Sequence, residues 1–221
     1  MEKEEIKLRW FVLAEDLFWY PGIRRRDTEV DIDNKFIKQV FHEGIYPAYT
    51  ENRYYHTFRH IFYMLDNIKD FELPPKDRIL LELAIWFHDL VYDTTFDKNE
   101  QYSANAFEEF GKEIGLKKKY IRQVKSLIMI TTHKKLPLTK LEKIICDLDL
   151  REFVSDRQEL NAVEVRKEYS HLSDEEWEKS RTEFVESMLG KRHIYHTKRY
   201  RHMLEDQARL NLAKEIEHIK K

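Results

Sequence analysis

The sequence is organised around one stretch, Leu80-Leu-Glu-Leu-Ala-Ile-Trp-Phe-His-Asp-Leu-Val91, which is apolar along most of its length. A helix that is apolar nearly all round is buried in the core of a protein. His88 and Asp89 are therefore expected at buried positions, where polar or charged side chains need a hydrogen-bond partner or a metal ion. The stretch predicts a core helix that ends in a buried histidine and aspartate.

A second histidine motif precedes this helix, in the order Tyr54-Tyr-His-Thr-Phe-Arg-His60. Because an α-helix has 3.6 residues per turn, His56 and His60 are expected on one helical face. A third motif lies at the end of the apolar segment Leu141–Leu148. Asp147 is the next-to-last residue of this segment, and Asp149 directly follows it. Each motif brings an imidazole or a carboxylate to an apolar helix.

Four of these residues have the side chains that a divalent transition metal, Mg²⁺ or Mn²⁺ prefers: His60, His88, Asp89 and Asp149. One packed core could bring them together. The alternative is that each is a hydrogen-bonded core residue, and composition alone leaves the two interpretations at even weight.

Composition narrows the classes of protein that are compatible with the chain. A length of 221 residues suits one well-filled core, so a single domain over residues 1–221 is expected. The net charge of -2 argues against a nucleic-acid or membrane partner. Cys146 is the single cysteine, and no apolar run is long enough to span a membrane, so a cytoplasmic protein is expected.

Apolar residues recur at helical spacing, and no useful strand alternation appears. The fold is predicted to be all-α, a helical bundle of roughly eight to ten helices. Its core covers about residues 50–155, with the N- and C-terminal helices packed on it. The expected helices cover residues 3–19, 32–42, 57–71, 76–89, 99–115, 120–133, 141–148, 155–169, 173–189 and 197–221.

The ordered motifs Tyr55-His-Thr-Phe-Arg-His60, Phe87-His-Asp89 and Asp147-Leu-Asp-Leu150 resemble the HD-domain superfamily of metal-dependent phosphohydrolases. More narrowly, the chain resembles the branch of predicted metal-dependent HD phosphohydrolases. Asn99-Glu100 and the segment Ala208-Arg-Leu-Asn-Leu212 add to this resemblance, which covers most of the chain. It implies an HD-type helical domain.

The resemblance also implies site residues. His60, His88, Asp89 and Asp149 match the superfamily's four metal ligands, with Asp147 as the alternative to Asp149. Two alignments with superfamily members disagree about His56 and His60. We prefer His60 as the ligand, because His56 then lies one turn away and can protonate a leaving group.

Three further residues receive predicted roles near these ligands. Asp93, four residues past Asp89, is expected to orient or deprotonate the attacking water, or else to cap its loop. Arg53 is the best candidate to hold a phosphate, because guanidinium binds phosphate oxygens bidentately. His133 is either a contact to substrate or a second metal, or a favourable charge at a helix C-terminus.

The predicted function is a metal-dependent phosphohydrolase that acts on a small phosphorylated compound, with a nucleotide preferred. Metal-activated water would attack phosphorus, and the ester is left open between monoester and diester. The cofactor is one divalent ion (Mn, Mg, Zn, Ni or Fe), with a second ion less expected. The alternatives are a di-iron HD-type oxygenase and a non-catalytic metal-binding interaction module. The sequence leaves the oligomeric state open.

Overall fold

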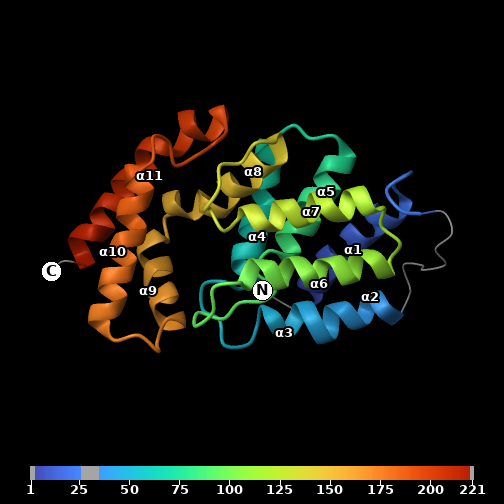
Figure 1. The fold of residues 1–221 in the computed structure, drawn as a ribbon, viewed down its shortest axis with the longest axis horizontal. Coiled ribbons are helices and arrows are strands. Elements are labelled where there is room, and N and C mark those ends of the chain that lie inside the picture. Colours follow the sequence, from blue (N-terminus) through green and yellow to red (C-terminus); the bar gives the residue numbers. More distant parts are fainter. Residues whose placement is uncertain (1–2, 26–34, 220–221) are drawn as a thin grey trace. The chain divides into compact units, whose positions relative to one another are not determined.

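The computed structural model describes residues 3–25 and 35–219, and in these residues the fold is all-α, as predicted (Figure 1). The described segments hold no β-structure beyond one isolated bridge between Arg24 and Leu116. The α-helices are α1 (Lys3–Trp19), α2 (Lys35–Gln39), α3 (Tyr46–Ala48), α4 (Phe58–Asn67), α5 (Pro75–Phe87), α6 (Asn99–Glu113), α7 (Lys118–Ile130), α8 (Lys140–Asp149), α9 (Gln158–Glu168), α10 (Asp174–Gly190) and α11 (Lys198–Ile219). Nine of them have at least ten residues, in agreement with the expected eight to ten.

The chain divides into two compact units. The first contains residues 1–51 and 56–136, and the second contains residues 52–55 and 137–221. The single-domain organisation expected from the sequence stays a prediction, and each unit is described by itself.

The first unit is built around α5, whose apolar residues are buried on every side. Trp86 and Phe87 at its end contact Trp10 of α1, with ring centroids 5.6 and 6.1 Å apart. The hydroxyl of Tyr49 donates a hydrogen bond of 3.0 Å to the carbonyl of Trp86. Burying a large aromatic side chain contributes roughly 2–3 kcal/mol, so this aromatic cluster fixes the end of α5 against its neighbours.

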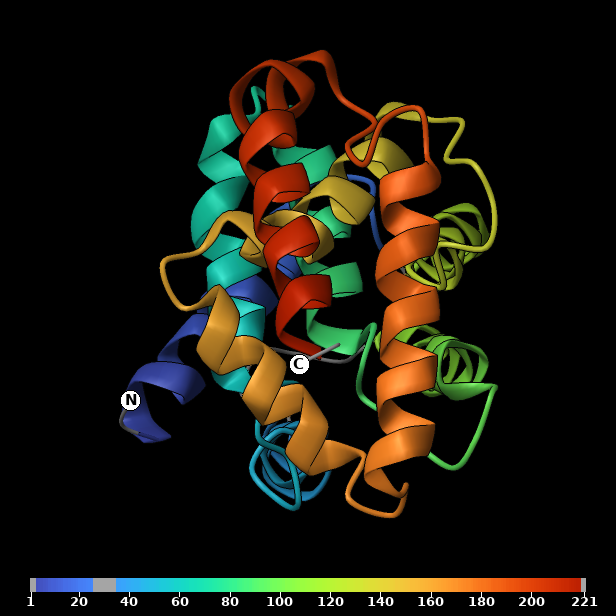
Figure 2. The ribbon, with the colours of Figure 1, turned by 90° about the vertical axis from the view of Figure 1, so that its left-hand side faces the viewer.

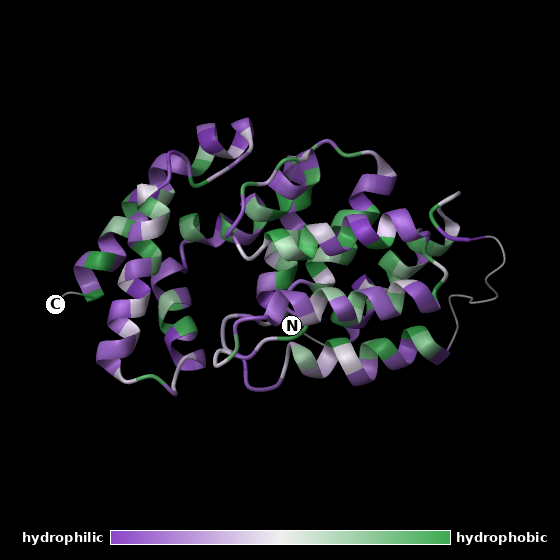
Figure 3. Cartoon of the chain, viewed as in Figure 1, coloured by the Kyte–Doolittle hydropathy of each residue, from purple (hydrophilic) through white to green (hydrophobic). Residues whose placement is uncertain are grey.

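The remaining helices of the first unit pack around this centre. α4 and α1 contact α5, and the neighbouring helices α6 and α7 pack against each other and against α5. Figure 3 shows hydrophobic and hydrophilic residues alternating along these helices, the pattern of helices with one buried face.

The second unit contains α8 to α11, and α10 and α11 pack side by side (Figure 2). Buried carboxylates hold the segment that leads into α11. Asp147 accepts hydrogen bonds from the backbone N–H groups of His196 (2.6 Å) and Thr197 (2.8 Å). Glu205 accepts hydrogen bonds from the backbone N–H groups of Ile194 and Tyr195.

Several boundaries differ from the prediction for local reasons. Residues 32–34 of the helix expected over residues 32–42 lie outside the described residues. α2 covers Lys35–Gln39, the π-helical turn Val40–Ile45 follows it, and α3 ends at Ala48. Pro47 lies in the first turn of α3, where a missing N–H costs nothing. Within the described residues, no helix is both long and apolar enough to cross a membrane.

Candidate metal centre

The end of α5 orients His88. This residue follows the last helical residue and keeps a helical backbone, and its side chain is 1% exposed. Its ring nitrogen Nδ1 lies 2.9 Å from the carbonyl oxygen of Ile85. A carbonyl oxygen can only accept a hydrogen bond, so Nδ1 carries a hydrogen, and in the neutral ring Nε2 presents a lone pair.

Asp89 faces that lone pair. Its Oδ2 lies 3.0 Å from Nε2 of His88, and its side chain is 15% exposed. A neutral imidazole nitrogen and an ionised carboxylate both accept hydrogen bonds, so they do not approach closely unless a cation neutralises the pair. That cation is either a proton on Nε2 or a metal ion. The hydrogen bond from Nδ1 to a backbone carbonyl is typical of a histidine that binds a metal through its other ring nitrogen. The pair therefore fits a metal site.

His60 brings the second imidazole to this place. It lies in the first turn of α4, is 1% exposed, and its ring centroid is 5.5 Å from that of His88. Thr57 fixes the start of α4, because its side chain accepts a hydrogen bond from the backbone N–H of Arg59. The structure therefore brings the rings of His60 and His88 close together, and their role as metal ligands stays a prediction.

His56 differs from the expectation that it shares a helix with His60. It lies in a turn, because α4 begins only at Phe58, after the Thr57 cap. The expectation that His56 and His60 lie on one helical face is therefore wrong, and α4 begins one residue after the expected start at Thr57. The rings of His56 and His60 nevertheless lie 5.9 Å apart, and the ring of His56 packs 4.1 Å from that of Tyr92. Tyr92 was not singled out in the sequence, since nothing in its immediate neighbours marks it.

Asp93 lies in the exposed loop after His88 and Asp89 and organises it. Its Oδ1 accepts hydrogen bonds from the backbone N–H (2.8 Å) and the hydroxyl (2.7 Å) of Thr95. Asn99 closes the loop: its amide oxygen accepts from the backbone N–H of Asp93, and its amide nitrogen donates to the Asp93 carbonyl. Loop capping, one of the two predicted roles, is therefore observed; a role in activating water stays a prediction.

His133 follows α7, with a backbone φ of 54° in the left-handed region, which histidine tolerates better than most residues. Its backbone N–H donates to the carbonyl of Ile130, so it terminates the helix. This position agrees with the helix-end alternative, and a contact to substrate or a second metal stays a prediction.

In the second unit, Arg53 lies on a short segment that α9 anchors. One carboxylate oxygen of Glu168 accepts hydrogen bonds from the backbone N–H groups of Tyr54 and Tyr55, both at 2.8 Å. Arg53 itself is half-buried. Glu168 was not identified from the sequence, because more than a hundred residues separate it from the segment that it holds.

The two aspartates of α8 have different surroundings. Asp149 is the last residue of the helix and is half-buried, whereas Asp147 is fully buried. Burial raises the pKa of Asp147 to about 6, although hydrogen bonds from His196 and Thr197 partly offset that effect. Because both Asp147 oxygens already accept backbone N–H groups at the start of α11, Asp147 serves a structural role. Asp149 is the better candidate ligand.

The comparison with protein families agrees with this chemistry. The HD domain family matches residues 53–153, which include every predicted ligand. This match is consistent with the HD-domain superfamily, as the resemblance in its motifs predicted. No curated protein and no solved structure matches the chain.

Proposed function

We propose that the HD domain at residues 53–153 is a metal-dependent phosphohydrolase that acts on a small phosphorylated compound, with a nucleotide preferred. The observation that carries this proposal is the environment of His88. Its Nδ1 donates to the Ile85 carbonyl, and its Nε2 faces the carboxylate of Asp89 at 3.0 Å. Such a pair, next to the ring of His60, suits a divalent cation.

The proposed ligands of one divalent ion are His60, His88, Asp89 and Asp149. The two histidines each offer an imidazole nitrogen, and Asp149 offers a carboxylate oxygen. The place of Asp149 in this set rests on the resemblance of its motif to the HD superfamily and on its donor chemistry. Mixed nitrogen and oxygen donors are compatible with Mn, Mg, Zn, Ni or Fe. When bound, the ion supplies Lewis acidity, which polarises a phosphoryl oxygen and acidifies water.

The remaining roles belong to side chains of the protein. We assign His56 to protonate the oxygen of the leaving group, because its ring lies 5.9 Å from that of His60 and packing against Tyr92 limits its rotation. Arg53 is assigned to orient the phosphate, with two N–H groups directed at two phosphate oxygens. Asp93 is assigned to orient or deprotonate the attacking water, from a loop position that its hydrogen bonds with Thr95 help to fix.

The preference for a nucleotide rests on exposed aromatic side chains close in sequence to the site residues. Tyr54 is 52% exposed and Phe96 is 42% exposed, so neither contributes mainly to a core. An aromatic ring that is open to solvent can stack on a nucleobase.

The test is a screen of phosphorylated metabolites with each of several divalent ions, in which inorganic phosphate released from monoesters and the phosphomonoester released from diesters are measured for the wild type and for His88→Ala. We expect phosphate release from a nucleotide or another small phosphoester in the wild type alone. If no compound is hydrolysed with any ion, or if His88→Ala is equally active, the proposed function is wrong.

A further inference from the structure

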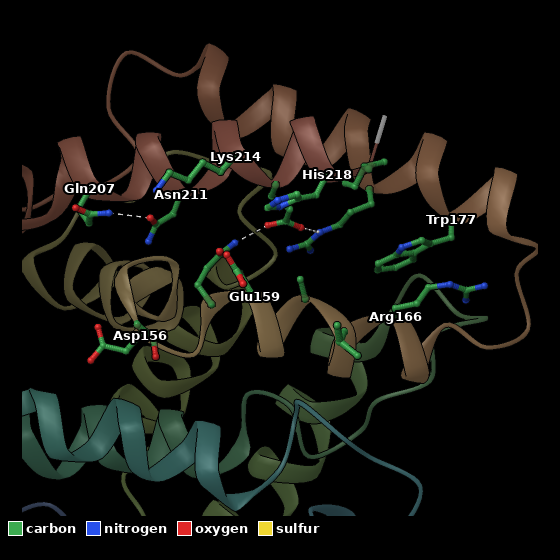
Figure 4. Close-up of a pocket in the computed structure, with 15 residues that line it drawn as sticks. Asp156, Glu159, Arg166, Trp177, Gln207, Asn211, Lys214 and His218 are labelled. Atoms are coloured by element: carbon green, nitrogen blue, oxygen red, sulfur yellow. Dashed lines mark hydrogen bonds and ion pairs between the residues drawn. The ribbon is translucent and has the colours of Figure 1, made fainter. Parts of the chain in front are cut away.

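The second unit has a pocket, open to solvent on one side, with a volume of about 780 Å³ between α9, α10 and α11 (Figure 4). Its residues come from the second unit alone and include none of the predicted metal ligands. Pockets of roughly 300–1,000 Å³ are typical of small-molecule sites. The pocket therefore has room for an organic ligand, and its lining indicates which kind.

The floor of the pocket is an ion pair that is already satisfied. Arg181 of α10 donates to Glu215 of α11 at 2.6 Å, and the two side chains are 14% and 7% exposed. The other oxygen of Glu215 accepts a hydrogen bond of 2.7 Å from the side chain of Gln158. Since these charges cancel, the floor fixes the shape of the pocket and adds little net charge.

One end of the pocket is aromatic. Trp177 of α10 is half-buried, with its ring centroid 5.3 Å from that of Tyr169 and 5.6 Å from the guanidinium carbon of Arg166. Arg166 is held in place by hydrogen bonds to the carbonyls of Tyr169 and Leu172. Figure 4 shows Trp177 and Arg166 together at this end. A planar apolar group of a ligand suits such a surface.

The rest of the lining has mixed charge. Asp156 and Glu159, at the start of α9, contribute carboxylates, and Lys214 and His218, one turn apart on α11, contribute cationic or basic groups. All four side chains are exposed. Figure 4 shows Asp156 at the end of the pocket away from Trp177, with Glu159, Lys214 and His218 between the two ends.

The charges in the lining are balanced, with three acidic side chains, three basic side chains and one histidine. A polyanion such as a nucleoside triphosphate would meet the carboxylates of Asp156 and Glu159, which disfavour it. A simple amine would meet Lys214. A ligand with one charge of each sign satisfies both groups.

We infer that this pocket binds a small zwitterion of the α-amino acid type, with an ammonium and a carboxylate close together and a flat aromatic group beyond them. The ammonium pairs with Glu159, the carboxylate pairs with Lys214, and the ring lies toward Trp177. This inference does not depend on the proposed hydrolase activity.

The test is calorimetric titration of the full chain, after removal of metal, with L-phenylalanine and its two single-charge analogues. Phenethylamine lacks the carboxylate, and 3-phenylpropionate lacks the ammonium. Solvent-exposed ion pairs contribute up to about 1 kcal/mol each, so we expect phenylalanine to bind up to about fivefold more tightly than either analogue. Adenosine monophosphate is included as a competing class of ligand.

Two substitutions in the lining separate the charges. Glu159→Gln should weaken binding of phenylalanine and phenethylamine but leave binding of 3-phenylpropionate unchanged. Lys214→Met should weaken binding of phenylalanine and 3-phenylpropionate but leave binding of phenethylamine unchanged. Glu178→Gln and Lys179→Met are matched controls, because both residues are exposed on α10 outside the lining, and both variants should bind phenylalanine normally.

Three outcomes would overturn the inference. One is no binding of phenylalanine at millimolar concentration by a protein whose circular dichroism shows it to be folded. Another is equal affinity for phenylalanine and phenethylamine. The third is tighter binding of adenosine monophosphate that is lost in Lys214→Met and retained in Glu159→Gln, which would assign the pocket to a nucleotide.

Discussion

Nε2 of His88 lies 3.0 Å from Oδ2 of Asp89, while Nδ1 of the same ring lies 2.9 Å from the Ile85 carbonyl. The carbonyl requires a hydrogen on Nδ1, so Nε2 is the ring nitrogen that faces the carboxylate. A neutral imidazole nitrogen and an ionised carboxylate would repel each other at this distance, and a proton on Nε2 or a metal ion relieves that repulsion. A cation at this place explains why a buried histidine and a mostly buried aspartate directly follow the core helix α5.

Substituting either member of the pair should abolish metal binding without unfolding the protein. His88→Ala and Asp89→Ala should each reduce the bound metal to background, because the site loses a donor. In metal-free protein, Asp89→Ala should melt at the same temperature as the wild type or higher, since it removes a mostly buried carboxylate. Metal analysis and thermal melting measure both effects, and full metal occupancy in the two variants would place the site elsewhere.

His56 and His60 should respond differently to substitution. His60→Ala should lose the metal and with it all activity. His56→Ala should keep the metal and lose ~100- to 10,000-fold in rate, the contribution of a general acid. That loss should shrink for p-nitrophenyl phosphate, whose leaving group needs little protonation.

The control for this comparison is Tyr92→Phe, which keeps the ring that packs against His56 and should retain most of the rate. Loss of metal in His56→Ala together with retention in His60→Ala would reverse the two assignments.

Glu82 on α5 predicts a pH dependence of stability that is separate from the metal centre. Burial raises its pKa from 4.5 to about 7, with repulsion from Asp16 added and attraction to Arg78 partly offsetting it. Between about pH 4.5 and 7 the folded protein therefore binds a proton that the unfolded chain does not. The free energy of unfolding should fall as the pH rises through this window.

Glu82→Gln, which cannot ionise, should remove this dependence. Between pH 5 and 8, the wild type should lose about 2–3 kcal/mol relative to Glu82→Gln, as measured by urea denaturation at both values. Glu113→Gln, at an exposed position of α6, is the matched control and should follow the wild type. Parallel curves for the wild type and Glu82→Gln would show that Glu82 ionises in the folded protein as it does in water.

Much of the fold follows from local sequence signals. The apolar stretch that ends at His88 is a core helix, as predicted. Ser173 and Glu176 form a capping box at the start of α10, with hydrogen bonds in both directions. The prediction that His56 shares a helix with His60 was wrong, because Thr57 caps the start of α4 and His56 precedes it. Thr139 and Glu142 form a second capping box that the same spacing rule identifies.

Other features depend on contacts between residues that are distant in sequence. The hydrogen bonds from Tyr54 and Tyr55 to Glu168 have no local signal. The pocket of the second unit combines polar side chains from three helices, none of which forms a recognisable motif. The roles of Arg53, Asp93 and His133 depend on a substrate and therefore stay predictions.

Metal binding is tested most directly by metal analysis combined with thermal melting of the same preparations. Wild-type protein with Mn²⁺ at about a hundred times its dissociation constant should contain one ion per chain and melt roughly 5–10 °C above the EDTA-treated protein, since binding contributes about 2.7 kcal/mol. His88→Ala should show neither the ion nor the shift. A wild-type protein that contains no divalent ion, and whose melting temperature is the same after EDTA treatment and with each of Mn²⁺, Mg²⁺, Zn²⁺, Ni²⁺ and Fe²⁺, would contradict the account.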